Sequence, residues 1–484
     1  MTSTPAPSKY AVEERNVALT GMIGRPRRVL DVGCGIGLNG LFARHRGAEV
    51  VGIEIAQGTK AQAERVLHKV VPANIEDDAS CETWLGKDRF DLILFGDVLE
   101  HTVDPLAVLR RITHYLEDEG HVIVSLPNVA AWTVRLALLS GRFDYEKSGI
   151  LDDTHLRFFT RDSSIRLVEE AGLEVLRVGE NPLLVRAAKN LILASMNDHT
   201  DDDPTALMQT PAYKLYQGVV RPVESAIARQ APGLFAFQNV IVARKRPAPR
   251  KLSLTVGMLT MDEEESIEKM ILEIRAAAPD AKILCVDSST HDRTPEIARS
   301  LGAHVLRQVP ARGHGPAMEL LLYSAAAQSD ALIYLDCDFT YPTSNIRVLR
   351  RLLEEEAVDV VNCARTRTRP AAMPVPNYFA NRTFAAMAHA LHGVPTCDVH
   401  SGMRAYRSSV IRAFDFDGEG DALPIDTLLW PAKCGYRVVE IPIDYDERVG
   451  ASKLRKLAGT VWTFIRLART FGVGERGGRA FEAR

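Results

Sequence analysis

The chain has 484 residues, of which 46% are hydrophobic and 25% are charged, and its formal net charge at pH 7 is −3. This length exceeds what one ordinary hydrophobic core accommodates and indicates two or three domains. The small negative charge argues against a dedicated nucleic-acid-binding protein, which would carry a basic surface, so we expect no nucleic acid partner.

The N-terminal segment MTSTPAPSK is short and polar and lacks the apolar stretch of a signal peptide. No run of about 18 uncharged apolar residues occurs, so we expect no membrane-spanning helix. The seven cysteines lie apart, without a C-x-x-C pair, which fits a reducing compartment and argues against a disulfide framework or a zinc site. We therefore expect a cytoplasmic protein, with any membrane contact peripheral and on the inner face of the plasma membrane.

Strand-like and helical segments alternate through the first half of the chain. Strands are predicted over 28–32, 50–55, 92–95, 121–125, 173–178 and 240–243, and helices over 38–46 and 105–115. Such alternation predicts a parallel, doubly wound α/β sheet. The segment 190–231 is predicted to be helical and polar, with an exposed loop at DHTDDDPT.

A basic, proline-containing segment, RKRPAPRK at 244–251, is typical of a linker. After it the alternation restarts, with strands predicted over 253–259, 283–286, 304–307 and 331–335, and with helices from Glu264 and over 294–301. We therefore predict two doubly wound α/β domains, 1–247 and 252–484. The two halves show no internal repeat.

A glycine-rich loop, Asp31-Val32-Gly33-Cys34-Gly35-Ile36-Gly37, follows the first predicted strand and precedes a helix. Glycines there let the backbone turn sharply and approach a ligand closely. The second strand ends at Glu54, whose carboxylate can accept hydrogen bonds from both hydroxyls of a ribose. A dinucleotide loop usually reads G-x-G-x-x-G, whereas this loop reads G-x-G-x-G. A dinucleotide-dependent sugar dehydrogenase stays open as the alternative.

The glycine loop preceded by Asp31 resembles that of the class I S-adenosylmethionine-dependent methyltransferases, and the resemblance covers 10–245. It continues through ANIE (73–76), FDLILFGDVLEH (90–101), GHVIVSLPN (120–128) and GRFDYEKSGILDDTHLRFFT (141–160), the last being similar to a subgroup often found in cell-surface glycan clusters. It implies a Rossmann-like fold and S-adenosyl-L-methionine as cofactor. The implied cofactor-binding residues are Asp31, Gly33, Gly35, Gly37, Glu54, Asn74, Ile75 and Asp97.

Three further polar residues lie in segments expected near that cofactor. His101 follows the fourth strand and is a candidate general base for a hydroxyl acceptor, or it only shapes its loop. His155 and Arg157 are expected either to contact the acceptor or to make ordinary hydrogen bonds within their loop. Methyl transfer needs little acid–base help, since the sulfonium is already activated and in-line positioning supplies most of the rate.

In the second half, Asp336-Cys337-Asp338 directly follows the predicted strand 331–335. Two carboxylates at positions i and i+2 can jointly hold Mg²⁺ or Mn²⁺, which neutralises a diphosphate leaving group. Asp287 ends the second strand of this half and Glu263 follows the first, so both are expected in the crevice at the carboxyl ends of the strands. The alternative for Glu263 is a charged first helical turn.

These acids resemble those of the family-2 glycosyltransferases of GT-A fold, particularly enzymes like dolichyl-phosphate mannosyltransferase, and the resemblance covers 252–470. It also rests on TMDEEESI (260–267), VDSSTHDRT (286–294), RGHGPAMELLL (312–322), SGMRAYR (401–407) and EIPIDYDERVGASKL (440–454). It implies a nucleotide-sugar donor, metal and diphosphate binding by Asp336 and Asp338, and nucleoside binding by Glu263 and Asp287. The residues implied to face the phosphates of donor and acceptor are Arg404, Arg448 and Lys453.

The glycosyl acceptor is open between a lipid phosphate and a sugar hydroxyl. A polyprenyl phosphate is already an anion and needs cations, whereas a hydroxyl needs a general base, for which Asp398 and Asp426 are the candidates. We favour polyprenyl phosphate, and a glycan is the alternative. The stretch LRKLAGTVWTFIRLARTFGV, with basic and apolar residues at helical spacing, is expected either to lie on an anionic membrane or to pack on its own domain.

The whole chain is therefore predicted to be a bifunctional enzyme. One half is expected to transfer methyl groups and the other to transfer a sugar with inversion, both in the synthesis of a cell-surface polysaccharide. The alternative is that one half is catalytic and the other is a non-catalytic binding module.

Overall fold

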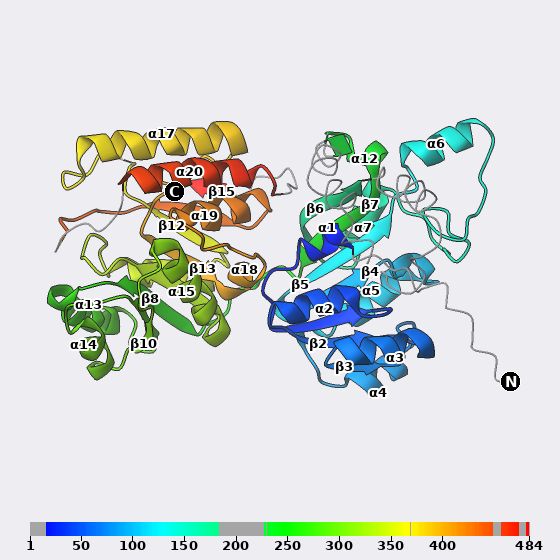
Figure 1. Ribbon diagram of the computed structural model, residues 1–484, viewed down its shortest axis with the longest axis horizontal. Helices are drawn as coiled ribbons and strands as arrows, with labels where there is room; N and C mark the ends of the chain where they lie inside the picture. The colour runs from blue at the N-terminus through cyan, green and yellow to red at the C-terminus, as the bar shows by residue number, and fades with distance from the viewer. Residues whose placement is uncertain are drawn as a thin grey trace. The chain divides into compact units, whose positions relative to one another are not determined.

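The computed structural model describes residues 16–182, 227–228, 230–367, 369–448, 456–473 and 481–483. The chain divides into two compact units, Met1–Arg246 and Pro247–Arg484, called the N-terminal and C-terminal units below. Each unit contains one β-sheet flanked by helices (Figure 1). The predicted α/β fold class is confirmed for both units, and each sheet is mixed, because it includes an antiparallel strand.

The N-terminal unit has a seven-stranded sheet of order β3-β2-β1-β4-β5-β7-β6. Its strands are β1 (Arg28–Val32), β2 (Glu49–Ile53), β3 (Lys69–Val71), β4 (Phe90–Gly96), β5 (Leu116–Pro127), β6 (Glu174–Pro182) and β7 (Ala236–Arg244). Strands β1 to β5 are parallel, and β7 runs antiparallel to both β5 and β6. The order of the strands reverses between β1 and β4, and ligands of such sheets bind at the carboxyl ends of the strands there.

The helices of the N-terminal unit connect the strands and cover the sheet. They are α1 (Val17–Thr20), α2 (Leu38–His45), α3 (Gln57–Val66), α4 (Asp78–Leu85), η1 (Leu99–His101), α5 (Pro105–Thr113), α6 (Trp132–Leu139), α7 (Arg161–Glu170) and α12 (Pro232–Phe235). Helix α5 shows why these boundaries form: the Asp104 side chain accepts a hydrogen bond from Ala107 N–H, and Pro105 occupies the first turn. The predicted helical segment 190–231 lies almost wholly outside the described residues.

The C-terminal unit has an eight-stranded sheet of order β10-β9-β8-β11-β13-β12-β14-β15. Its strands are β8 (Leu254–Thr260), β9 (Lys282–Asp287), β10 (His304–Arg307), β11 (Ala331–Leu335), β12 (Val360–Ala364), β13 (Met403–Arg407), β14 (Val438–Pro442) and β15 (Phe481–Ala483). Strand β13 runs antiparallel between β11 and β12, and the other pairs are parallel. Here too the order reverses, between β8 and β11, which places a crevice at their carboxyl ends.

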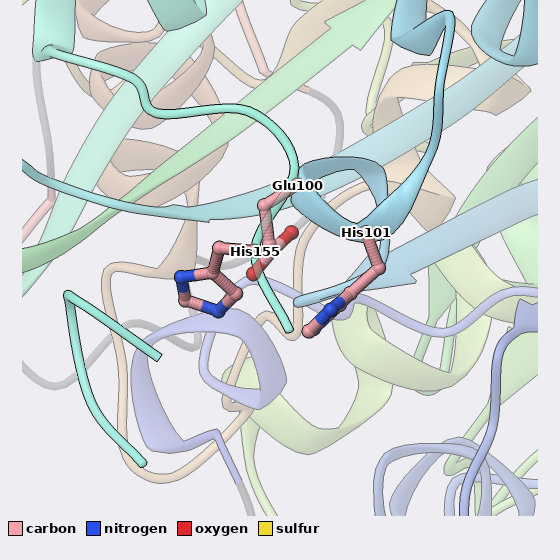
Figure 2. A group of neighbouring side chains, drawn as sticks. All are labelled: Glu100, His101 and His155. Atoms are coloured by element: carbon pink, nitrogen blue, oxygen red, sulfur yellow. The ribbon is translucent and has the colours of Figure 1, made fainter. Parts of the chain in front are cut away.

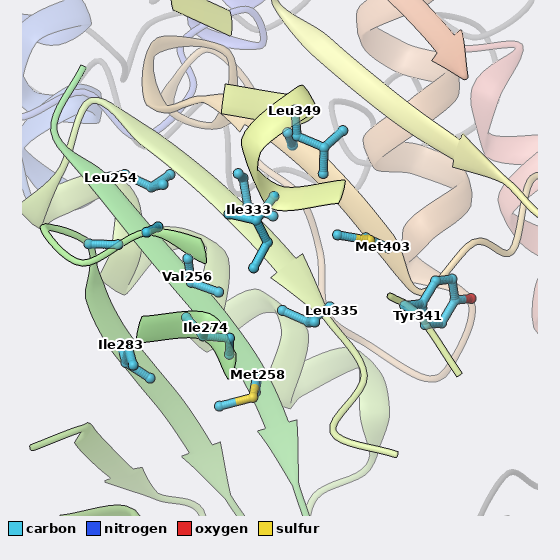
Figure 3. Close-up of a cluster of buried hydrophobic side chains, with 14 of the residues drawn as sticks. Leu254, Val256, Met258, Ile274, Ile283, Ile333, Leu335, Tyr341, Leu349 and Met403 are labelled. Atoms are coloured by element: carbon cyan, nitrogen blue, oxygen red, sulfur yellow. The ribbon is translucent and has the colours of Figure 1, made fainter. Parts of the chain in front are cut away.

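The core of the C-terminal unit forms where one face of the sheet packs against α13 and α16 (Figure 3). Leu254, Val256 and Met258 alternate along β8 and are buried on this face, and Ile274 and Leu349 reach them from the two helices. Alternate residues of β8 face this core, which fixes the register of β8 and so fixes where its carboxyl end lies. The helices are α13 (Glu264–Ala277), α14 (Thr294–Ser300), α15 (His314–Gln328), α16 (Asn345–Glu355), α17 (Val375–His392), α18 (Ser408–Arg412), α19 (Leu423–Lys433) and α20 (Lys456–Thr470).

Helices α17 and α20 lie side by side in the C-terminal unit (Figure 1). The rings of Phe384 and Phe464 pack edge to face at 5.5 Å, and His392 Nε2 donates to Leu467 O at 2.9 Å. Within the part of the chain that the structure describes, no helix combines the length and the apolar character needed to cross a bilayer.

Candidate active sites

The glycine-rich loop after β1 adopts a backbone that side chains would disturb. Gly33, Gly35 and Gly37 all have positive φ, at +59°, +54° and +87°. A Cβ built on Gly33 would lie 2.6 Å from Val98 Cγ2, so both the backbone angle and the space require glycine. Cys34 N–H donates to Ile53 O at 2.9 Å, which fastens the loop to the end of β2.

Glu54, at the end of β2, connects to this loop. One carboxylate oxygen accepts from Gly35 N–H at 2.9 Å and the other from Ala56 N–H at 2.8 Å. Each oxygen keeps a further lone pair, so the side chain can also accept hydrogen bonds from two ribose hydroxyls. The structure thus places the glycine loop and Glu54 together, as the sequence predicts, and ribose binding stays a prediction.

Asp31 lies beneath the loop rather than on its surface. Its side chain is buried, and its Oδ2 accepts from Gly40 N–H at 2.9 Å in the first turn of α2. A carboxylate in that position stabilises the positive end of the helix and holds the loop in place. The predicted contact of Asp31 with the methionine end of a cofactor is not tested by this arrangement and stays a prediction.

Asn74 and Ile75 follow β3 at the same edge of the sheet. Asn74 is exposed, and its side-chain oxygen accepts from Glu76 N–H at 3.0 Å. Ile75 is half-buried, and its carbonyl accepts from the Arg111 guanidinium at 2.9 Å. An adenine contact by these two residues is compatible with their position and stays a prediction.

Asp97, just after β4, is held by a polar network that the sequence did not reveal. It has a positive φ of 58°, which is uncommon for a residue other than glycine. Its carboxylate accepts from Ser125 Oγ at 2.6 Å and from Gln238 Nε2 at 2.7 Å. Asn16 Nδ2 donates to Ser125 Oγ at 2.8 Å and so extends the network to the start of α1. These partners come from β5, β7 and the N-terminus, so only the folded chain brings them together.

His101 and His155 come together although they are far apart in the sequence (Figure 2). Their ring centroids lie 4.8 Å apart in an edge-on arrangement, and Glu100 lies between them. Burial, followed by the charge of Asp97, raises the pKa of Glu100 well above its ordinary value. Arg157 is exposed, and its guanidinium donates to Val103 O, so its predicted acceptor contact would need that bond to be exchanged.

In the C-terminal unit, Asp336 and Asp338 follow β11 as predicted. Asp338 is 3% exposed and accepts from Thr340 N–H at 3.1 Å and from the Arg448 guanidinium at 2.8 Å. Burial, followed by the negative charge of Asp338, raises the pKa of Asp336 to about 7. An acid whose charge is disfavoured by burial and by a neighbouring carboxylate is suited to bind a divalent cation together with that neighbour. Oxygen ligands on a strand-end turn fit Mg²⁺ or Mn²⁺ at Asp336 and Asp338.

Gly402 is a contact of this site that the sequence reading missed. A Cβ at Gly402 would lie 2.2 Å from Asp336 Oδ2. Gly402→Ala is therefore expected to displace the Asp336 carboxylate and to weaken Mn²⁺ affinity by roughly 10- to 100-fold, measured by titration with paramagnetic resonance detection. Gly459→Ala in α20 is the matched control, since apart from its chain neighbours and its own helix backbone no described heavy atom lies within 4 Å of a Cβ there. Equal affinities in both variants would contradict this prediction.

Glu263 and Asp287 lie at the carboxyl ends of the neighbouring strands, as predicted. Asp287 is fully buried and accepts from Thr260 Oγ1 and Ser289 Oγ, both at 2.7 Å, and it pairs with Arg307. Glu263 is half-buried at the N-cap of α13. Nucleoside binding by the two residues stays a prediction, and a ligand reaching Asp287 would have to replace one of its present partners.

The prediction that Arg404 faces a phosphate needs correction, because Arg404 is fully buried inside the unit. Its guanidinium donates to Asn362 Oδ1 at 2.6 Å and to Val399 O at 2.8 Å, and it also reaches Pro424 O. A side chain whose donors are all directed at internal acceptors supports the packing of β13 rather than a phosphate. The predicted phosphate contact of Arg404 is therefore not supported, whereas Arg448 lies at the acid pair. Lys453 lies outside the described residues.

The two candidate general bases also need correction. Asp398 is fully buried in a bidentate ion pair with Arg365, at 2.7 and 2.9 Å. Although burial raises its pKa, the pairing with Arg365 brings the pKa of Asp398 below its ordinary value, which makes it a poor base. Asp426 is fully buried as well and forms an ion pair with Arg466 of α20. Both carboxylates hold the unit together rather than face an acceptor hydroxyl.

Arg365 is a charged residue of this site that was not predicted. Besides pairing with Asp398, it lies 5.8 Å from the Tyr341 ring and 5.4 Å from the Tyr445 ring, and its charge opposes the rise in the pKa of Asp336. The Tyr341 hydroxyl accepts from Gly402 N–H at 2.6 Å. The position of Arg365 directly after β12 is the one feature from which a place near the site could have been predicted. Nothing in the sequence indicated its partners.

The surroundings of His400 predict that the C-terminal unit loses stability in acid. His400 contacts Asn381 of α17 at 3.0 Å and Thr463 of α20 at 2.9 Å, and burial lowers its pKa to about 4, with Arg365 adding to the shift and Asp398 opposing it. The unfolded chain, with a histidine pKa of about 6.5, binds the proton first as the pH falls, so this contribution to stability is complete above pH 6.5 and is lost towards pH 4. We expect a loss of about 3 kcal/mol in that window, measured by hydrogen exchange of α17 and α20. His400→Gln should flatten the profile, and an unchanged profile would contradict the assignment.

Two family models match the chain in separate places. The model described as a methyltransferase domain matches residues 9–178, and the model described as glycosyl transferase family 2 matches residues 255–414. The two matches fall in different compact units of the structure.

Relatives of both kinds are found. The chain is 37% identical to the dolichyl-phosphate hexose transferase of Haloferax volcanii over 207 residues, which cover 43% of this chain and 88% of that protein. It is 29% identical to the undecaprenyl-phosphate mannosyltransferase of Micrococcus luteus over 210 residues, which cover 40% of this chain and 84% of that protein. It is 28% identical to the ubiquinone biosynthesis O-methyltransferase of Idiomarina loihiensis over 181 residues, which cover 36% of this chain and 71% of that protein.

The sheet topologies, the strand-end acids and these matches agree with one another. The match to a methyltransferase domain argues against the alternative that the first half is a dinucleotide-dependent sugar dehydrogenase. The chain belongs to the family-2 glycosyltransferases through its C-terminal unit, and its N-terminal unit contains a methyltransferase domain.

Proposed function

We propose that this chain is a bifunctional enzyme of cell-surface polysaccharide synthesis. The N-terminal unit transfers a methyl group from S-adenosyl-L-methionine to an acceptor oxygen, and the C-terminal unit transfers a hexose from a nucleotide sugar to a polyprenyl phosphate with inversion. The observation that carries the second activity is the acid pair Asp336 and Asp338, with Arg448 beside it. The relatives named for dolichyl-phosphate and undecaprenyl-phosphate transfer support the lipid acceptor.

The chemistry of the acceptor also favours a phosphate. A sugar hydroxyl needs a general base to remove its proton, whereas a phosphate oxygen attacks as an anion. Both predicted bases, Asp398 and Asp426, are bound in buried ion pairs. Arg448, 30% exposed beside the acid pair, is a cation that can orient an anionic acceptor. When bound at Asp336 and Asp338, Mg²⁺ or Mn²⁺ would stabilise the departing diphosphate.

In the N-terminal unit, the loop and strand-end residues are proposed to hold S-adenosyl-L-methionine. Gly33, Gly35 and Gly37 leave room for the ligand against the backbone, and Glu54 offers two acceptor oxygens for the ribose. The bound cofactor supplies an activated methyl group, so the protein's part is to align the acceptor. The relative named as an O-methyltransferase supports an oxygen acceptor.

We propose peripheral attachment to the inner face of the plasma membrane through α17 and α20. Large apolar side chains of these neighbouring helices and of the residue that follows α20 are exposed, namely Val375, Phe379, Leu391, Val461, Phe464 and Phe471. Exposed apolar side chains on neighbouring helices are suited to the interface of a bilayer. Such an attachment would bring the C-terminal unit to a lipid-linked acceptor.

The test is incubation of the full chain with a panel of nucleotide sugars, polyprenyl phosphate and tritiated S-adenosyl-L-methionine, followed by mass spectrometry of the lipid fraction. A hexosylated polyprenyl phosphate and a tritiated product are expected. Glu54→Ala should abolish tritium transfer and leave hexosylation intact, because the two ligands bind separate units. Transfer of hexose to a glycan hydroxyl instead of the lipid would overturn the acceptor assignment, and absence of either product would make that unit a binding module.

A further inference from the structure

Glu100, His101 and His155 are not among the residues proposed above to hold S-adenosyl-L-methionine. Each residue offers one potential ligand atom, and these three atoms all lie within 4.8 Å of one another. Figure 2 shows the Glu100 carboxylate lying between the two imidazole rings. Glu100 and His101 come from η1, whereas His155 comes from the loop before α7, so the fold assembles the group from two segments.

Glu100 is the unusual member. The residue is 1% exposed, and neither carboxylate oxygen makes a hydrogen bond within the described part of the chain. Burying an unpaired carboxylate is unfavourable by several kcal/mol, and buried charges are normally paired or bound to metal ions. Protonation alone would leave a buried hydroxyl with no partner at hydrogen-bond distance in the present geometry. A cation between Glu100 and the two imidazoles would satisfy it.

The two histidines are oriented as metal ligands. His101 Nδ1 lies 3.1 Å from Thr154 O, and His155 Nδ1 lies 3.1 Å from Ile150 O. A carbonyl oxygen only accepts, so each Nδ1 carries a proton, and in the neutral ring the lone pair is then on Nε2. Metal-bound histidines typically donate their second ring N–H to a backbone carbonyl in this way, which fixes the tautomer and the ring.

We propose that Glu100, His101 and His155 bind a divalent transition-metal ion beside the methyl-acceptor site. A carboxylate with two imidazoles favours Mn²⁺, Fe²⁺, Co²⁺ or Zn²⁺ over Ca²⁺ or Mg²⁺, which prefer oxygen ligands. This site therefore differs in chemistry from the all-oxygen pair Asp336 and Asp338. Three protein ligands leave coordination positions open for a ligand oxygen.

The role of the ion rests on the proposed methyl transfer. A hydroxyl of the acceptor bound to the ion has a lowered pKa and loses its proton to water. The oxygen then forms a bond to the methyl carbon as the carbon–sulfur bond breaks, and the bonding pair passes to sulfur to give a neutral thioether. Such an ion selects acceptors with a hydroxyl, or two neighbouring hydroxyls, and disfavours nitrogen or carbon acceptors without one.

The test uses the full chain carrying Asp336→Asn and Asp338→Asn, so that retained metal reports the N-terminal unit. After equilibrium dialysis against Mn²⁺, Co²⁺ or Zn²⁺, this protein should retain about one equivalent, and the Co²⁺ form should show ligand-field absorption altered by imidazole. Added to this background, His101→Asn and His155→Asn keep a donor near the Nδ1 position but lack Nε2, and each should weaken binding at least tenfold. Glu100→Gln should do the same, and His45→Asn, on exposed α2 surface, should not.

Binding of S-adenosyl-L-methionine is measured by calorimetry on the same samples. If the parent protein binds S-adenosyl-L-methionine but retains no more metal than the Glu100→Gln variant, the metal site is overturned and the methyltransferase assignment stands. Metal retention without cofactor binding would overturn the proposed methyl transfer and leave the metal site standing. Equal metal binding in the Asp336→Asn/Asp338→Asn parent and in both histidine variants made on it would show adventitious binding and also overturn the site.

Discussion

Asp338→Asn is expected to reduce sugar transfer at least about 100-fold, because removing one preorganised charge contact to a reacting group costs that much or more. Asp338 is buried, bonded to Thr340 and paired with Arg448, so the substitution removes charge with little change of shape. With one acid gone, a divalent cation loses a ligand and the diphosphate leaves without full neutralisation. The measurement is turnover of a radiolabelled nucleotide sugar at saturating Mn²⁺.

Two comparisons make this result specific. Methyl transfer in the same sample should be unchanged, since Asp338 belongs to the other compact unit. Asp280→Asn removes a carboxylate from a surface ion pair with Arg350 and should leave sugar transfer unaffected, because exposed pairs contribute little. Unchanged turnover in Asp338→Asn would remove the metal site from this position.

The sequence predicted all strands of the first sheet except β3, and β8 to β11 of the second sheet, and it missed β12 to β15. Strands β1, β10 and β11 have the predicted bounds, because each is a short apolar or β-branched run that ends at a glycine, acid or turn. Strand β13 was not predicted as a strand, since MRAYR contains two arginines that only become buried through internal hydrogen bonds. The alternation of apolar and polar residues along a strand does not indicate the direction in which the strand runs. The antiparallel pairing of β7 and β13 could therefore not be predicted from the sequence pattern.

Acids at strand ends were predictable for a physical reason. Parallel strands bring their carboxyl ends to one edge, so Glu54, Asp287 and Asp336 had to lie beside their crevices once the strands were located. Basic and acidic residues elsewhere were not predictable in the same way. Arg404 lies in the motif SGMRAYR and Asp398 shortly precedes it, but their partners, Asn362 and Arg365, are about forty and about thirty residues away.

Contacts between residues far apart in the sequence also explain why the positions of His101 and His155 were predicted but their approach to each other was not. The sequence placed His101 after the fourth strand and His155 in a polar loop, yet neither position says that the rings approach to 4.8 Å. The carbonyl contacts that fix the two tautomers come from Thr154 and Ile150, whose backbone geometry is set by the loop before α7. Chemistry of this kind depends on orientation, which becomes visible only in the fold.

Asp426→Ala is expected to destabilise the C-terminal unit by about 3–5 kcal/mol, the usual cost of removing one partner from a buried ion pair. The Asp426 and Arg466 side chains are both 0% exposed, and they join α19 to α20. The substitution would leave the Arg466 guanidinium buried, still donating to Glu419 O and Asp421 O but without its counter-charge. The measurement is the urea dependence of hydrogen exchange in peptides of α19 and α20.

The double variant Asp426→Leu/Arg466→Met separates a structural role from a catalytic one. Replacing both charges by apolar side chains of similar volume avoids the uncompensated charge, so most of the lost stability should return. If Asp426 only holds α20 in place, this variant should also transfer sugar at close to the wild-type rate. If Asp426 were instead the base for a hydroxyl acceptor, the double variant would fold and remain inactive, and the case for a phosphate acceptor would lose one of its supports.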